Sequence, residues 1–231
     1  MSQNMPGCPG ENLLGIARDF LEKLSNGSIT PSQAKRFLRG ENPFDVPMDT
    51  ASQLERWRVL LVGTFGITID FASIKIPERQ AGFYRLIVVP KGLTMNQIVA
   101  ALRKKFEVSL YVEDLDASVI TNDRTNTETY AVWVRDNAEA DEENKNLSAD
   151  DLAAQKIPGV TVTERLLHEL VYFSETGKHL DVINITLCNG SRYSDGCVPR
   201  VSWLVDDRGL CVHWYGSGSR YDYLRSRAVV S

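Results

Sequence analysis

The chain has 231 residues, of which 43% are hydrophobic and 24% are charged, with a net charge of -4 and an isoelectric point near 5.5. This composition is typical of a globular protein that can bury a core, and it does not indicate disorder. The acidic balance argues against general binding to nucleic acid or to anionic membranes, since both require a basic field.

The sequence contains neither a long apolar run nor a metal-ligand motif. No stretch approaches the 18 apolar residues of a membrane span, and the start of the chain lacks a basic region followed by an apolar one. We therefore expect no membrane insertion and a cytoplasmic protein, unless another route displays it on a virion or cell surface. The cysteines form no CxxC pair, so we expect no metal or cofactor; they are Cys8, Cys188, Cys197 and Cys211.

Residues 1–50 are predicted to form a small helical appendage and a linker. Apolar residues recur at helical spacing over 11–24. A second, short helix is predicted from Thr30, Pro31 and Gln33, which supply an N-cap, a first-turn proline and a capping-box partner. Its predicted stop is Gly40, and a proline-containing linker follows at residues 41–49.

Residues 51–231 are predicted to form one α+β domain. The segments 58–76 and 82–90 are rich in β-branched and aromatic residues, which favours strands. A helix is predicted to begin at the Thr94–Gln97 capping box, with Phe106 closing its buried face.

The middle of the chain predicts a further strand, a loop and a second helix. The segment TYAVWVRD (129–136) alternates as a half-buried strand does, and the acidic run 137–146 indicates a solvated loop. A capping box at Thr161 and Glu164 predicts a helix that ends at Gly177. Two helices among strands give the α+β class.

The C-terminal segment has an unusual composition. Residues 179–231 contain no Lys, Glu, Gln or Met, although the first 178 residues contain 33 of them. The segment holds four of the eight tyrosines and two of the four tryptophans, among many Gly, Ser, Asp and Arg. This composition is similar to that of an antibody paratope, where Tyr gives stiff contacts and Ser and Gly give adaptable ones. A turn-rich β segment, in which Lys and Glu are scarce, is the alternative explanation.

Spacing within this segment indicates a hairpin with a structural frame. The units VSWLVDDRG (201–209) and VHWYGSGSR (212–220) each place one residue between Val and Trp and then pass into a turn. In a strand, alternate side chains point to opposite faces, so the frame is predicted to pack inward and the irregular positions outward. The predicted frame residues are Val198, Val201, Trp203, Val212, Trp214 and Leu224.

Four motifs in the segment resemble the variable proteins of diversity-generating retroelements, in particular the compact type of archaea, candidate-phylum bacteria and archaeal viruses. The motifs are GSRYSDG (190–196), VPxVxW (198–203), VxW (212–214) and the terminal LRSRAVVS. The resemblance is most specific over 187–231, is weaker over 129–139 and 163–173, and does not cover the N-terminal helices.

The resemblance implies a C-type lectin-type fold whose C-terminal coding repeat is rewritten at adenines by a reverse transcriptase. Randomising the first two bases of AAC codons cannot produce Lys, Glu, Gln, Met or Trp, which matches the composition of the segment. It also implies that Cys188 and Trp203 belong to the scaffold. The implied variable, solvent-facing residues are Tyr193, Ser194, Cys197, Arg200, Ser202, Leu204, Asp206, Cys211, His213, Tyr215, Ser219, Tyr221 and Tyr223.

The function that follows is a non-enzymatic display protein that binds an unknown protein ligand through its variable surface. The N-terminal helices are a second candidate surface, for an assembly partner. One alternative is a cysteine enzyme similar to formylglycine-generating enzymes, using Cys188, Cys197 or Cys211. Another is a calcium-dependent carbohydrate-binding lectin, whose carboxylate oxygens would have to converge; the candidates are Asp195, Asp206, Asp207 and Asp222.

Overall fold

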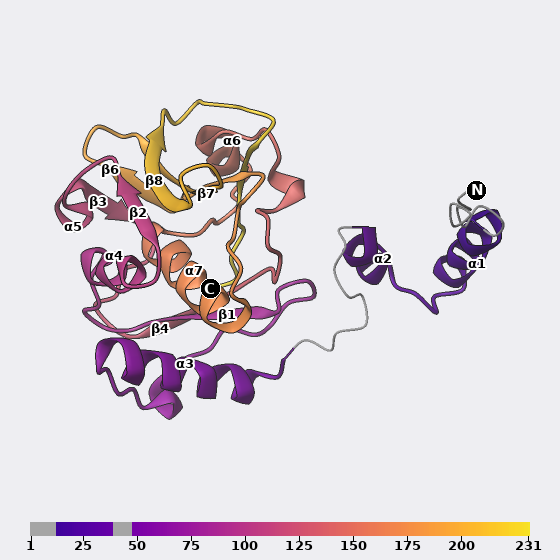
Figure 1. Ribbon diagram of the computed structural model, residues 1–231, viewed down its shortest axis with the longest axis horizontal. Coiled ribbons are helices and arrows are strands. Elements are labelled where there is room, and N and C mark those ends of the chain that lie inside the picture. Colours follow the sequence, from indigo (N-terminus) through magenta and orange to yellow (C-terminus); the bar gives the residue numbers. More distant parts are fainter. Residues whose placement is uncertain (1–12, 39–47) are drawn as a thin grey trace, which may run out of the picture. The chain divides into compact units, whose positions relative to one another are not determined.

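The computed structural model describes residues 13–38 and 48–231, which form a mixed α+β structure with seven α-helices and several sheets (Figure 1). The chain divides into two units, Met1–Pro47 and Met48–Ser231. None of the helices in the described ranges has both the length and the apolar character needed to cross a membrane.

The first unit contains the two predicted helices, α1 (Leu13–Ser25) and α2 (Pro31–Leu38). The predicted capping box forms: the Gln33 backbone N–H donates to Thr30 Oγ1 at 3.2 Å, and the Thr30 N–H donates to Gln33 Oε1 at 2.9 Å. The predicted stop at Gly40, most of the linker and Cys8 lie outside the described residues.

The second unit begins with a helix where strands were predicted. Helix α3 (Thr50–Phe65) covers the first part of segment 58–76, and the rest is irregular apart from a short 3-10 turn at Phe71–Ser73. The strand prediction is wrong because the buried residues Gln53, Trp57 and Leu61 recur every four positions, and this helical period outweighs β-propensity.

Side chains of helix α3 form hydrogen bonds with backbone groups at the edge of strand β1 (Arg85–Val89). The Gln53 amide accepts from Leu86 N–H at 2.8 Å and donates to Tyr84 O at 2.8 Å, and the Trp57 indole N–H donates to Leu86 O at 2.8 Å. The edge of β1 that faces away from β4 is thus paired by side chains of a helix in place of another strand.

Strand β1 pairs with β4 (Tyr130–Val134) in an antiparallel ladder, which confirms two predicted strands. The predicted half-buried alternation is wrong, because Ala131 to Val134 are all buried. The ladder lies between α3 on one side and α7 (Val162–Thr176) on the other (Figure 1), so both of its faces are covered.

Both predicted capping-box helices are confirmed. Helix α4 (Met95–Arg103) starts at the Thr94–Gln97 box, and α7 starts at the Thr161–Glu164 box and ends at Gly177, which adopts a left-handed conformation. The expectation of only two helices in this unit is wrong, because α3 and two short helices join them. The short ones are α5 (Leu115–Ser118) and α6 (Ala149–Ala154).

A five-stranded sheet covers the opposite side of α7, and its strand order is β2-β8-β7-β5-β9. The predicted hairpin forms its centre, where β7 and β8 pair antiparallel over seven residue pairs. The outer pairs, β2 with β8 and β5 with β9, are parallel. The bounds are β2 Glu107–Leu110, β5 Ile185–Leu187, β7 Val198–Leu204, β8 Gly209–Tyr215 and β9 Leu224–Ser226. A separate ladder joins β3 (Val119–Asn122) to β6 (Ser191–Tyr193).

The acidic run 137–146 is a loop, as predicted, with a short 3-10 turn, but it is only partly solvated: Glu142 and Glu143 are exposed, whereas Asp141 and Asn144 are buried. Asp141 is 1% exposed and accepts from Arg135 Nη1 at 2.6 Å and from Ala228 N–H at 2.7 Å. Glu142 accepts from Arg225 at 2.7 Å. The run fixes the end of the chain, because its carboxylates find arginines and backbone N–H groups that are distant in sequence.

A buried ionic network anchors the terminal LRSRAVVS motif. Asp181 accepts from Arg227 Nη2 at 2.7 Å and from Arg165 Nε at 2.9 Å, and Arg165 also donates to Glu169 at 2.9 Å. These two arginines hold the pKa of Asp181 below its ordinary value against the opposing effect of burial. The motif is therefore structural in this fold.

Candidate ligand-binding face

The register of β7 and β8 sorts the predicted variable and frame residues onto two faces. Directly opposite residues in an antiparallel pair share a face. Arg200 lies opposite His213 and Ser202 opposite Cys211, on the face turned away from α7. Val201 lies opposite Val212 on the other face, and both are fully buried in the main core.

Three tyrosines gather beside this outer face. The Tyr215 and Tyr221 rings lie 5.1 Å apart, and those of Tyr221 and Tyr223 stack at 5.2 Å. The hydroxyls of Tyr215 and Tyr223 are 3.3 Å apart, and the Arg200 guanidinium lies 5.1 Å from the Tyr215 ring. We call the whole surface the tyrosine face; it comprises Arg200, Ser202, Leu204, Cys211, His213, Tyr215, Tyr221 and Tyr223.

The exposure of the tyrosine face is uneven. Tyr221 and Tyr223 are 41% and 42% exposed, whereas Ser202 and Cys211 are 2% and 7% exposed. The expectation that these two small side chains face solvent is wrong. They pair with each other in the middle of the sheet, with Arg200 in contact with Ser202, so larger neighbours cover them.

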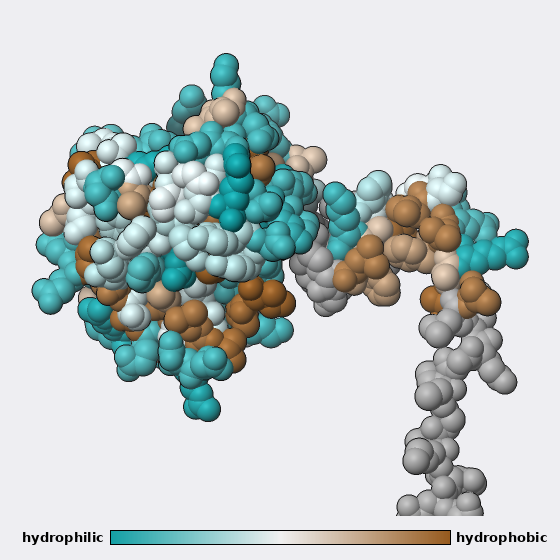
Figure 2. Space-filling view, turned by 90° about the horizontal axis from the view of Figure 1, so that it is seen from above, coloured by the Kyte–Doolittle hydropathy of each residue, from teal (hydrophilic) through white to brown (hydrophobic). Residues whose placement is uncertain are grey.

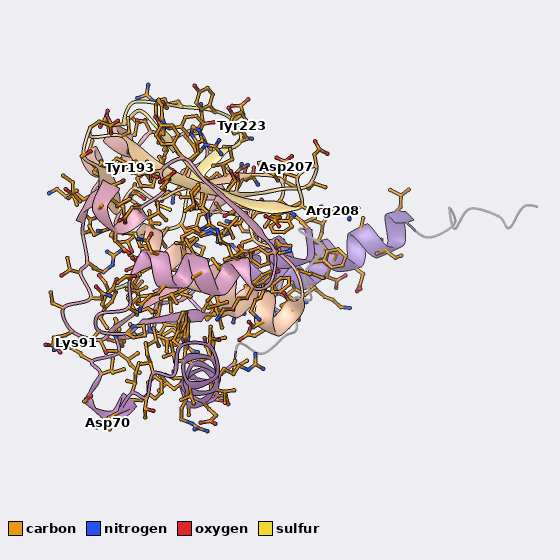
Figure 3. The ribbon with its side chains drawn as sticks, turned by 60° about the vertical axis from the view of Figure 1, so that its left-hand side comes forward. Asp70, Lys91, Tyr193, Asp207, Arg208 and Tyr223 are labelled. Carbon is orange, nitrogen blue, oxygen red and sulfur yellow. The ribbon has the colours of Figure 1, made fainter. Side chains whose placement is uncertain are left out.

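The other predicted variable residues lie apart from the tyrosine face. Tyr193 differs from its predicted exposure: it is 6% exposed, belongs to β6 and pairs with Val119. Ser194 and Cys197 flank the turn between β6 and β7, Asp206 lies in the turn between β7 and β8, and Ser219 follows β8. Tyr193 and Asp207, the neighbour of Asp206, lie toward opposite sides of the molecule in Figure 3.

The predicted frame divides between two clusters. Val198 and Leu224 are fully buried, but they belong to a small cluster with Leu187 and Ala149. The prediction that Val198 and Val201 share an inward face is wrong. Residues three apart in a strand point to opposite faces, and Val198 shares its face with Arg200.

The two frame tryptophans are half-buried and pack against the main core. The Trp203 ring stacks on His179 at 3.2 Å and meets Phe106 at 5.3 Å. The Trp214 ring lies 5.7 Å from Tyr111. Both tryptophans thus contribute apolar contacts to the scaffold.

The three thiols within the described residues, Cys188, Cys197 and Cys211, lack the environment of an activated nucleophile. Burial raises the pKa of Cys188 to about 12, and burial is also the first cause of the raised pKa values of Cys197 and Cys211. A reactive cysteine has a depressed pKa, because the thiolate is the nucleophile. Across residues 13–38 and 48–231, no three His, Cys, Asp or Glu side chains gather in a way that could hold a metal ion.

Residues that the sequence did not single out lie beside the tyrosine face. Tyr111, just past β2, lies 4.8 Å from the His213 ring. A hollow of about 330 Å³ opens beside Ser202, Leu204 and Tyr223, with Ile183 on its wall. In the sequence, Tyr111 and Ile183 are marked only as apolar residues outside a predicted core. The parallel strand pairings that bring them beside the face have no local sequence motif.

Comparison with protein-family models, with curated proteins and with solved structures finds no match to this chain.

Proposed function

We propose that the protein is a non-enzymatic, ligand-binding variable protein of the diversity-generating retroelement type, with a C-type lectin-type fold. One observation carries the proposal. Six of the implied variable positions come from alternate residues of β7 and β8, and two more join them from the segment before β9. All eight lie on one side of the sheet; six of them are exposed or half-exposed, and Ser202 and Cys211 are buried beneath the others.

The sheet offers a physical reason why such a surface can change its side chains. Strand β7 is paired on both sides, by β8 and β5, and β8 by β7 and β2. These pairings use backbone N–H and C=O groups, which are the same for every side chain. Substitutions at exposed or half-exposed positions, such as Leu204, His213 and Tyr221, therefore leave the ladder intact.

The composition of the surface supports binding to a protein. Tyrosines with paired hydroxyls give large contact areas with few rotatable bonds, and arginine adds directed hydrogen bonds. The raised thiol pKa values argue against the alternative of a cysteine enzyme.

The nucleotide sequence around the gene tests the proposal. We expect a near-copy of the codons for residues 190–231 close to a reverse transcriptase gene, differing from the coding sequence only where the copy has adenine. A locus without such a copy would remove the explanation for the missing Lys, Glu, Gln and Met, and with it the retroelement assignment.

A further inference from the structure

Arg200 is a half-buried cation without a carboxylate partner among the described residues. Its Nη1 donates to Ser202 Oγ at 3.4 Å, a long bond, and its buried Nε has no hydrogen-bond acceptor. The other buried arginines of this unit differ. Arg165 and Arg227 share Asp181, and Arg85 contacts Asp136 and Glu175.

The tyrosine face supplies no anion to Arg200. Arg200 lies opposite His213 in the ladder and over the ring of Tyr215. Neither neighbour is a carboxylate, and none of the eight residues that define the face is acidic. Because the Nε of Arg200 is enclosed, the donors left for a ligand are those of the two Nη groups, which match a carboxylate in a planar, two-point geometry.

Ser202, which Arg200 contacts, also lines the hollow of about 330 Å³. The hollow's other walls include the apolar side chains of Ile183, Ile185 and Leu204 and the ring of Tyr223. An apolar recess with a wall residue, Ser202, that contacts a cation is complementary to a group that is part apolar and part anionic.

The outer wall of the hollow is held rigidly. Ile183 is 79% exposed, and its neighbour Val182 is 42% exposed. The Glu139 carboxylate accepts from the backbone N–H groups of Val182, Ile183 and Asn184 at 3.1, 3.2 and 2.9 Å. Apolar side chains shown to solvent on a fixed loop reduce the entropy lost on binding. In Figure 2 the end of the unit that carries β7 and β8 is mostly pale, with apolar side chains gathered in separate patches.

We infer that this site binds a protein segment that places a carboxylate on Arg200 and an adjacent apolar side chain in the hollow. The inference rests on the proposed ligand-binding function, and it names the chemistry of the ligand that the present set of side chains recognises. Arg200 and Leu204 lie at implied variable positions, whereas Ile183 lies before the first of them. Diversification can therefore change the charge of the ligand that the site prefers, whereas part of the hollow's apolar wall stays constant.

Selection of a phage-displayed library of random linear peptides on the full chain tests the inference. We expect the enriched peptides to carry Asp or Glu next to Leu, Ile or Phe. Synthetic copies should bind at least about tenfold more weakly to Arg200→Gln, since a charge-assisted pair is lost. Arg200→Lys should give an intermediate Kd, because it keeps the charge and loses the planar group.

Matched controls separate a local effect from a general one. Arg208→Asn removes one positive charge from the exposed turn of the same hairpin and should leave the Kd unchanged. Ile183→Ser should weaken binding, whereas Val59→Ser, at a 60% exposed position of α3, should not. Peptides with free and amidated C-termini distinguish a terminal carboxylate from a side-chain one.

The possible outcomes are distinct. Peptides that bind Arg200→Gln as well as the parent, but lose binding to Tyr221→Ala, would overturn the inference and leave ligand binding in place. Selection that yields no peptide dependent on the tyrosine face would count against both. The near-copy of the codons tests the proposed function without any peptide, so the two failures can be told apart.

Discussion

At the scale of single residues, positions of the C-terminal segment have opposite roles. Val201 is fully buried against the main core, whereas Tyr221 is 41% exposed at the edge of the tyrosine face. Mutational cost follows burial, because a cavity in a packed core is not refilled.

We therefore expect Val201→Ala to lower the free energy of unfolding by about 2 kcal/mol. Tyr221→Ser and Leu204→Ser should change it by less than about 0.5 kcal/mol each. Denaturant unfolding of the three variants measures this. Equal losses at all three positions would mean that the tyrosine face is part of the fold's support and is not free to vary.

His168 is the second residue with a marked environment. It is 1% exposed on α7, and neither ring nitrogen has a hydrogen-bond partner among the described residues. Burial, followed by the charges of Arg227, Arg165 and Arg85, lowers its pKa well below the ordinary value. The folded protein thus keeps this imidazole neutral.

Stability should consequently fall as the pH drops below about 6.5, because the unfolded chain binds a proton there that the folded chain does not. The slope from this one group is at most about 1.4 kcal/mol per pH unit. His168→Leu should flatten the dependence between about pH 6.5 and 5, because it removes the group that binds a proton only in the unfolded chain. Urea unfolding of the parent and of His168→Leu at several pH values measures this, and an unchanged slope in the variant would contradict the assignment.

At the scale of elements, Gln53 shows how one polar side chain sets the position of a helix. Its amide pairs two backbone groups at the edge of β1, which would otherwise be buried without partners. The cost of such unpaired groups exceeds the benefit of an average hydrogen bond.

We expect Gln53→Leu to destabilise the protein by about 2–3 kcal/mol, although leucine suits a helix and a buried site. Glu55→Ala, which breaks an exposed pair with Arg58 on the same helix, should leave the stability nearly unchanged, because solvent screens such a pair. Thermal unfolding compares the two. A small loss in Gln53→Leu would show that apolar contacts of Trp57 and Leu61 alone hold α3.

At the scale of the whole molecule, the division into two units separates the core from the N-terminal helices. Every residue of the two buried clusters lies at position 54 or later, in the second unit. In the first unit, Leu14, Leu21 and Phe37 are 89%, 62% and 57% exposed, so its helices bury little apolar surface between themselves.

A chain of residues 48–231 alone should therefore fold, with a melting temperature within a few degrees of the full chain. Ligand peptides selected on the full chain should bind it with the same Kd. Circular dichroism and calorimetry measure the first expectation. Loss of cooperative unfolding would show that the N-terminal helices complete the fold.

Local signals determined part of this protein from the sequence alone. Capping boxes placed the starts of α2, α4 and α7, and the repeated Val–x–Trp units placed the β7–β8 hairpin, because these patterns act over a few residues. The mixed α+β class follows from the same signals. The composition of residues 179–231 marked the segment that carries the candidate face.

Only the tertiary structure decided which side chains meet. Contacts with β1 made residues 58–65 helical. The packing of the sheets buried Tyr193 and Cys211. The acidic run came to hold the loop around Ile183. The parallel pairings of β2 and β9 lie outside any local pattern. The physical reason is common to all four: burial and long-range hydrogen bonds depend on residues far apart in sequence, and their free energies exceed local propensities.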